Sequence, residues 1–187
     1  MQKKPINSFL THPNTLTFFR IVSVPVIVVL LMMPNRFTAL LAGLIFSAAA
    51  ITDYFDGYLA RRYGLVSNLG KVMDPVADKL LVSCTLIMLC ALGWMPAWIA
   101  CVIIGRELAV SGLRNIIAQN KLDVSASSLG KYKTGFQIAA IIPLTFHYPA
   151  IGFDFQAIGM VFLWGALVFT LWSGADYFLR FRKLLST

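Results

Sequence analysis

Long apolar stretches separated by short polar turns run along the whole chain. Most approach the roughly 17 to 25 residues that an α-helix needs to cross the hydrocarbon core of a bilayer. Pro, Gly and Asn recur in the connections "MPNR", "LGWMP" and "YPAIGFD", where they favour turns. The pattern predicts an all-α integral membrane protein with six transmembrane helices. The six stretches lie near residues 17–33, from 37 into the segment at 53–56, from just before 74 to 92, and at 96–117, 134–148 and 156–178.

Composition supports a membrane protein. Of the 187 residues, 58% are hydrophobic and 13% are charged, whereas soluble globular domains carry about 25% charged residues. The length suits a single domain covering residues 1–187. The segment "PINSFLTHPN" at residues 5–14 is compatible with a short N-terminal interfacial helix.

The basic residues indicate the orientation. Six spans place both termini on one side, and on this topology all of the 16 Lys and Arg residues except Arg36 lie at that side. The positive-inside rule makes it the cytoplasmic side of the cell membrane. The net charge of +8 is then concentrated where anionic lipid headgroups lie. Nucleic acid is a poor partner, because the charges sit at span ends and no recognition module is visible.

Four of the eight acidic residues stand in one short segment, "DYFDGYLARRYGLVSNLGKVMDPVADKL". Asp53 and Asp56 are three apart, and Asp74 and Asp78 are four apart, so each pair shares a helix face. If the two helices pair through their cytoplasmic loop, four carboxylates converge and repel one another. Hard oxygen ligands in this number suit a pair of Mg²⁺ or Mn²⁺ ions. The alternatives are a solvated acidic loop and salt bridges to nearby Arg or Lys, but acidic residues at membrane depth are usually functional.

The residues between the aspartates have little side-chain bulk. Gly57 and Ala60 leave a face of the helix open, and Arg61 is a forked donor suited to phosphate. Ser67 and Gly70 are small residues of the joining segment. Taken alone, a Gly-Ala face is more often a helix-packing surface; beside four carboxylates at metal-binding spacing, it favours a ligand site.

The string Asp53-x-x-Asp56-Gly57-x-x-Ala60-Arg61, eight further residues, then Gly70-x-x-x-Asp74-x-x-x-Asp78 resembles the signature of the CDP-alcohol phosphatidyltransferase family. All eight fixed positions are filled. The resemblance implies six transmembrane helices, usually in a homodimer, and transfer of a phosphatidyl group from a CDP-linked lipid to an alcohol. It implies that all four aspartates bind two divalent cations and that Asp78 is also the catalytic base. The residues implied to bind the CDP-lipid are Gly57, Ala60, Arg61, Ser67 and Gly70.

Basic residues further along the chain suggest an anionic acceptor. The segments "GRE", "GKYKT" and "PNTLTFFR" are similar to those of family members whose acceptor is glycerol 3-phosphate. The substrates implied are therefore CDP-diacylglycerol and glycerol 3-phosphate. The residues expected to bind the acceptor phosphate are Arg106, Arg114, Lys131 and Lys133; ordinary positive-inside charge is the alternative.

Several other functions stay open at this stage. Within the family, the acceptor could be that of a cardiolipin-type or inositol-phosphate enzyme. From a different class, a divalent-cation channel or carrier would also use clustered Asp, but here all four lie at one membrane face and no repeats are visible. An aspartate-rich prenyl synthase does not fit the six hydrophobic spans.

Overall fold

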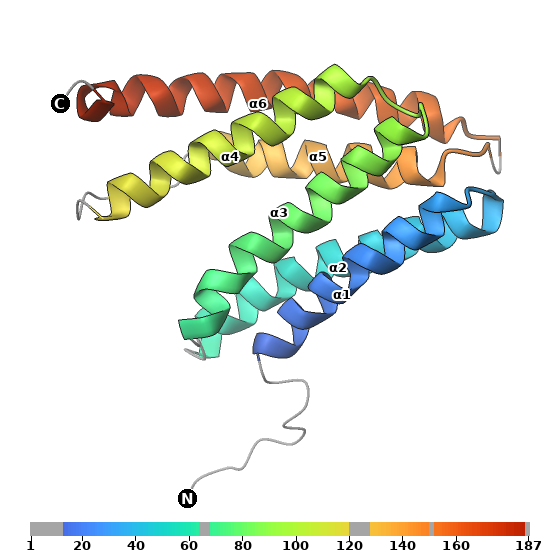
Figure 1. The fold of residues 1–187 in the computed structure, drawn as a ribbon, viewed down its shortest axis with the longest axis horizontal. Coiled ribbons are helices and arrows are strands. Elements are labelled where there is room, and N and C mark those ends of the chain that lie inside the picture. Colours follow the sequence, from blue (N-terminus) through green and yellow to red (C-terminus); the bar gives the residue numbers. More distant parts are fainter. Residues whose placement is uncertain (1–12, 64–67, 120–127, 150–151, 186–187) are drawn as a thin grey trace, which may run out of the picture. The chain divides into compact units, whose positions relative to one another are not determined.

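The computed structural model describes residues 13–63, 68–119, 128–149 and 152–185, and within them the chain is all-α. This confirms the helical fold class and the helix in each expected stretch. The helices are α1 (Pro13–Met32), α2 (Arg36–Tyr63), α3 (Asn68–Ala91), α4 (Ala97–Gln119), α5 (Ser128–Phe146) and α6 (Phe155–Leu185). They are drawn in Figure 1. The expected interfacial helix at residues 5–14 lies almost wholly outside the described residues.

The chain divides into two units, Met1–Thr85 and Leu86–Thr187, with the boundary inside α3. In the first unit, α1 and α2 form an antiparallel pair joined by a short turn (Figure 1). Asn35 caps α2, because its Oδ1 accepts hydrogen bonds from the backbone N–H of Phe37 at 2.9 Å and of Thr38 at 3.0 Å. Alanines of α2 let the two helices approach closely. The fully buried side chains of the pair include Leu31, Ala39, Ala42 and Phe46.

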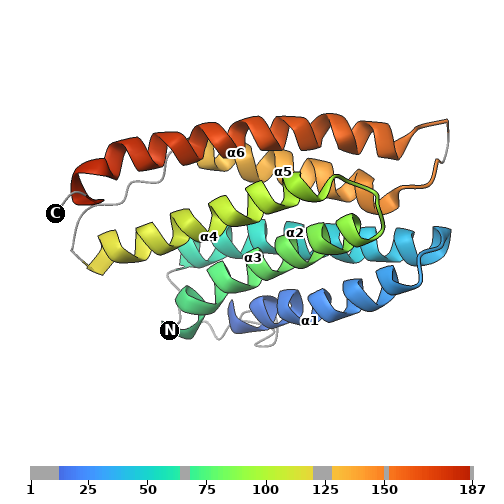
Figure 2. The ribbon, with the colours of Figure 1, turned by 45° about the horizontal axis from the view of Figure 1, so that its top comes forward.

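In the second unit, α5 and α6 form an antiparallel pair and α4 packs against α6 (Figure 2). Two glycines of α6 make the close approach possible. A Cβ built on Gly159 would lie 2.6 Å from Leu144 Cγ, and one on Gly165 would lie 2.7 Å from Phe136 Cδ1. Between α4 and α6, the side chains of Val110, Leu113, Ile117 and Tyr177 form a buried cluster.

Trp94, His147 and Gln156 connect the α3–α4 turn with the α5–α6 turn in the second unit. The rings of Trp94 and His147 stack with centroids 4.0 Å apart. Gln156 connects both, because its Oε1 lies 2.9 Å from His147 Nδ1 and its Nε2 donates to the Trp94 carbonyl at 2.6 Å. His147 has a φ of 50°, which a non-glycine residue seldom adopts. The link fixes the α3–α4 turn against the α5–α6 turn.

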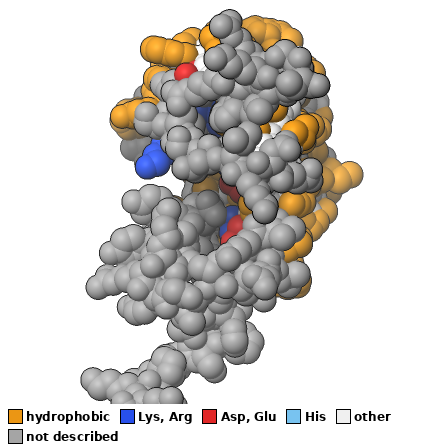
Figure 3. Space-filling model, turned by 90° about the vertical axis from the view of Figure 1, so that its left-hand side faces the viewer, with side chains coloured by type: hydrophobic (Ala, Val, Ile, Leu, Met, Phe, Trp, Pro, Cys, Tyr) orange, Lys and Arg blue, Asp and Glu red, His pale blue; other side chains and the backbone are white. Residues whose placement is uncertain are grey.

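The outward-facing side chains are largely apolar. Val29, Val161 and Leu171 are 64%, 72% and 55% exposed, and hydrophobic side chains cover much of the described surface in Figure 3. By length and composition, one helix among the described residues could cross a membrane: Phe155–Leu179 of α6, where 28% of the most apolar window is buried. Shorter apolar helical stretches are Thr17–Met32 and Arg36–Thr52.

The helices extend several residues beyond the predicted stretches at the starts of α3 and α5 and at the end of α6. We expected α3 to begin just before Asp74, with Pro75 in its first turn. It begins at Asn68, so Pro75 lies inside the helix. A proline there lacks the N–H that would bond to a carbonyl four residues earlier, and the helix nevertheless continues on both sides of it.

Candidate functional site

The signature residues fall on two helices of the first unit. Asp53, Asp56, Gly57, Ala60 and Arg61 lie in the second half of α2; their side chains are outside the described part of the structure. Gly70, Asp74 and Asp78 lie on α3, and Ser67 is outside the described residues. All eight fixed positions of the signature thus lie on α2 or α3, including Gly70, which was expected in the joining segment. The structure describes the side chains of Asp74 and Asp78.

Asp74 is held by two side chains of α1. The hydroxyl of Thr17 donates a short hydrogen bond to Asp74 Oδ1. Arg20 Nη2 donates to the same oxygen at 3.1 Å and forms an ion pair with it. The Arg20 side chain is 1% exposed, whereas that of Asp74 is 43% exposed. The partly exposed carboxylate of Asp74 is thus held by two buried side chains of α1.

The donor set fits a divalent cation as far as it is described. Asp74 and Asp78 are one helical turn apart on α3 and supply carboxylate oxygens, which Mg²⁺ and Mn²⁺ prefer. Among the residues with described placement, no group of three or more His, Cys, Asp or Glu side chains comes together. The two other predicted ligands, Asp53 and Asp56, are not among the residues whose side chains the structure describes.

A second polar cluster lies in the other unit, between α4, α5 and α6. Glu107 Oε1 accepts hydrogen bonds from Arg106 Nη1 at 2.9 Å and from Lys133 Nζ at short distance. Arg106 Nη2 donates to Ser173 Oγ at 2.9 Å. The Arg106, Glu107 and Lys133 side chains are 14%, 17% and 6% exposed. Two cations thus share one carboxylate oxygen in a mostly buried cluster.

Glycine makes room for the arginine of this cluster. A Cβ built on Gly174 would lie 3.2 Å from Arg106 Cγ and 3.6 Å from its Nε. That Nε is buried and has no hydrogen-bond partner among the described residues. The same holds for Gln137 Nε2, one turn after Lys133, and for Thr170 Oγ1, three residues before Ser173. Buried polar groups are normally paired, so these groups are available to a polar ligand or to water.

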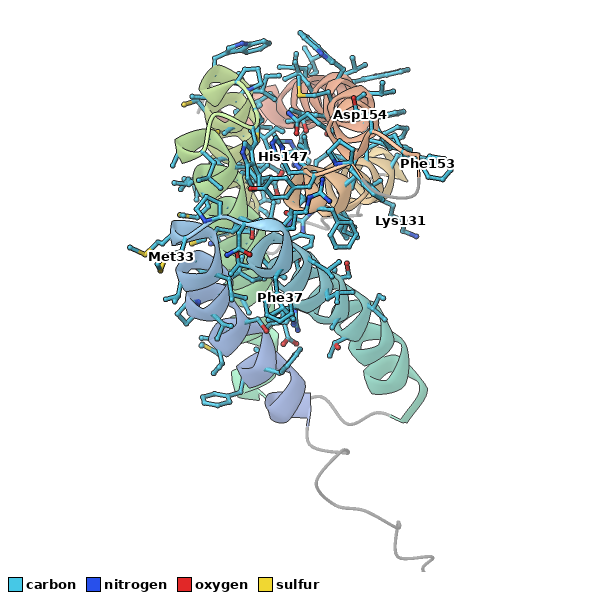
Figure 4. The ribbon with its side chains drawn as sticks, turned by 90° about the vertical axis from the view of Figure 1, so that its right-hand side faces the viewer. Met33, Phe37, Lys131, His147, Phe153 and Asp154 are labelled. Carbon is cyan, nitrogen blue, oxygen red and sulfur yellow. The ribbon has the colours of Figure 1, made fainter. Side chains whose placement is uncertain are left out.

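The four predicted acceptor residues divide into two kinds. Arg106 and Lys133 meet at Glu107. Arg114 and Lys131 are exposed, and Lys131 points away from the α5–α6 pair in Figure 4. Among the described residues, the ion pairs at Glu107 are those with Arg106 and Lys133.

Sequence reasoning missed the partners of the predicted residues. Thr17 and Arg20 belong to the segment "PNTLTFFR" that was noted for its resemblance, but neither was expected to contact Asp74. Glu107 stands next to Arg106, and Ser173 had no signal in the sequence. An Arg or Glu within an apolar stretch is itself a signal, because such residues are costly in a membrane unless paired.

Comparison with known proteins identifies the family of the chain. A sequence model of the CDP-alcohol phosphatidyltransferase family matches residues 10–172. The chain belongs to this family. A relative from Bacillus subtilis (strain 168) is 40% identical over 190 residues, covering 94% of this chain and 97% of the relative. One from Rickettsia typhi is 41% identical over 167 residues, covering 89% and 94%. One from Salmonella choleraesuis is 37% identical over 169 residues, covering 88% and 91%. All three are named CDP-diacylglycerol–glycerol-3-phosphate 3-phosphatidyltransferase.

Proposed function

We propose that the protein transfers the phosphatidyl group of CDP-diacylglycerol to glycerol 3-phosphate, which gives phosphatidylglycerophosphate and releases CMP. The observation that carries this proposal is the likeness to relatives of that name, which extends over nearly the whole of both chains. The family match also crosses the boundary between the two units, which supports treating residues 1–187 as one catalytic domain.

The first unit supplies the metal and nucleotide part of the proposed site. Asp53, Asp56, Asp74 and Asp78 would hold two Mg²⁺ or Mn²⁺ ions, which when bound neutralise charge on the pyrophosphate and on the departing CMP. The hydroxyl oxygen of the acceptor forms a bond to the lipid-side phosphorus, and the bond from that phosphorus to the CMP oxygen breaks. Asp78 takes the proton of the hydroxyl. The residues proposed to bind the CDP part are Gly57, Ala60, Arg61, Ser67 and Gly70.

The second unit supplies the proposed acceptor site. Arg106 and Lys133 are buried, cationic and already adjacent through Glu107, so they are the stronger candidates for the phosphate of glycerol 3-phosphate. Gln137 Nε2 and Arg106 Nε add buried donors beside them. Arg114 and Lys131 are exposed, so we expect them to contribute less to binding of the acceptor phosphate.

We further propose that all six helices span the cytoplasmic membrane, with both termini and the site on the cytoplasmic side. The exposed apolar side chains support lipid contact, because a soluble monomer seldom exposes extensive apolar surface. Helices α2 to α5 carry the acidic and basic site residues, which lowers their overall apolarity below that of α6. A homodimer, with membrane lipids around it, is the assembly that family membership leads us to expect.

An acceptor panel with the purified full chain tests the function. CMP release from CDP-diacylglycerol is measured with glycerol 3-phosphate, phosphatidylglycerol, inositol 1-phosphate or no acceptor. We expect release with glycerol 3-phosphate alone, its loss in excess EDTA, and its return with Mg²⁺ or Mn²⁺. CMP release with another acceptor would mean that the protein catalyses a different reaction of the family. Full activity in EDTA would contradict the two-cation site. Cation flux without CMP release would indicate a channel or carrier.

A further inference from the structure

Two buried side chains of α1 act on the same atom of α3. Thr17 and Arg20 are three residues apart, so they share a face of α1. Their exposed fractions are 3% and 1%. Both donate to Oδ1 of Asp74, which is 57 residues from Thr17 in the chain. A buried arginine of an apolar helix thus contacts a residue of the signature.

Two donors on one carboxylate oxygen restrict the rotation of the Asp74 side chain. With Oδ1 occupied, Oδ2 is the oxygen left for another ligand. The Asp74 side chain is 43% exposed although its donors are buried, so the held carboxylate remains accessible from the opposite side. Partners that orient a metal-binding carboxylate in this way affect metal affinity without touching the metal.

We infer that Thr17 and Arg20 are positioning residues for Asp74: they hold it through Oδ1 and thereby present Oδ2 to a divalent cation. The inference rests on the proposed function, in which Asp74 is a metal ligand. It assigns a task to α1, which contains none of the signature residues. Arg20 has two opposite effects on cation affinity in this proposal. Its hydrogen bond orients Asp74 and strengthens cation binding, whereas the positive charge of its guanidinium alone would weaken cation binding.

Mn²⁺ binding to the detergent-purified full chain, without substrate, tests the inference. The electron paramagnetic resonance signal of free Mn²⁺ gives the Kd directly and does not depend on turnover. Thr17→Val removes one donor and retains the shape and charge of the site. This variant therefore tests the inference even if Arg20→Met does not fold. Arg20→Met removes the other donor. We expect each change to raise the Kd for Mn²⁺ by roughly ten- to a hundredfold.

Two variants serve as controls. Ser23→Ala removes a buried hydroxyl of the same helix that donates to its own helix, to the Phe19 carbonyl at 2.8 Å. Arg36→Met removes an exposed arginine at the start of α2, which has no role in the proposed site. Both should bind Mn²⁺ as the wild type does.

The outcomes are distinct. Wild-type Kd values in Thr17→Val and Arg20→Met, beside a wild type that binds Mn²⁺, would overturn the inference and leave the proposed function intact. Tighter binding by Arg20→Met would overturn it too, because the guanidinium would then only compete with the cation. A wild type that binds no Mn²⁺ would overturn the metal site of the proposed function and this inference with it.

Discussion

At the residue scale, Lys131 and Lys133 offer a matched pair. They lie two positions apart on α5, yet Lys131 is exposed and Lys133 is 5% exposed and bound to Glu107. Charge-assisted contacts to an anion contribute about 1.5–3 kcal/mol each. Lys133→Ala should therefore raise the KM for glycerol 3-phosphate roughly ten- to a hundredfold, with little change in the KM for CDP-diacylglycerol. Steady-state kinetics with each substrate varied in turn measure both values.

Lys131→Ala is the control for that experiment. It removes the same charge from the same helix, but from an exposed position. We expect a change of a few-fold at most. Equal, small effects of the two substitutions on both substrates would mean that the basic residues serve membrane topology only, and that the acceptor assignment rests on the relatives alone.

Substitution of Glu107 should change the thermal stability, because its carboxylate binds both Arg106 and Lys133. Glu107→Gln removes the negative charge that Arg106 and Lys133 share, and removal of one partner from a buried ion pair destabilises by about 3–5 kcal/mol. The Tm in detergent should fall. Added glycerol 3-phosphate should raise the Tm of the variant more than that of the wild type, because the bound anion replaces the lost charge. An equal rise in both proteins would show that the phosphate binds elsewhere.

At the element scale, the sequence predicts the helices well and their polar contacts poorly. Apolar stretches bounded by Pro, Gly and Asn locate all six helices, since both signals are local in the chain. The start of α3 was misplaced because Pro75 is typical of a first turn but also occurs within helices. The pairing of Thr17 with Asp74 and of Lys133 with Glu107 joins residues 57 and 26 positions apart. Such contacts depend on how the helices pack, which spacing within one helix does not determine.

The close packing of α5 on α6 depends on glycine. A Cβ at Gly159 would come within 2.9 Å of the Leu144 backbone nitrogen, which cannot move aside as a flexible side chain could. Gly159→Ala should therefore destabilise the protein by about 1–3 kcal/mol. Gly112 of α4 has no atom within 4 Å of its built Cβ, so Gly112→Ala should be neutral or stabilising by about 0.5–1 kcal/mol. Thermal unfolding in detergent compares the two, and a Gly159→Ala protein as stable as the Gly112→Ala protein would contradict the tight contact.

At the scale of the whole molecule, the distribution of charge and the length of the helices together predict the orientation of the protein in the membrane. The 20 residues of α1 span about 30 Å at 1.5 Å per residue, which matches the hydrocarbon core of a bilayer. The turn after α1 would then lie at the opposite membrane surface from the start of α1. Arg36, the single basic residue expected on the outer side, is in that turn region and is exposed. On the proposed topology, the Lys131 end of α5 lies on the cytoplasmic side.

This orientation predicts a labelling pattern in intact cells. In a background where Cys84, Cys90 and Cys101 are replaced, a single cysteine is introduced by Asn35→Cys or by Lys131→Cys; both positions are exposed. A membrane-impermeant maleimide should label the Asn35→Cys protein in intact cells, because its turn faces outward. It should label the Lys131→Cys protein only after the membrane is permeabilised. Labelling of both proteins in intact cells would contradict the cytoplasmic placement of the acceptor residues, and with it the access of a cytoplasmic phosphate ester to Lys133.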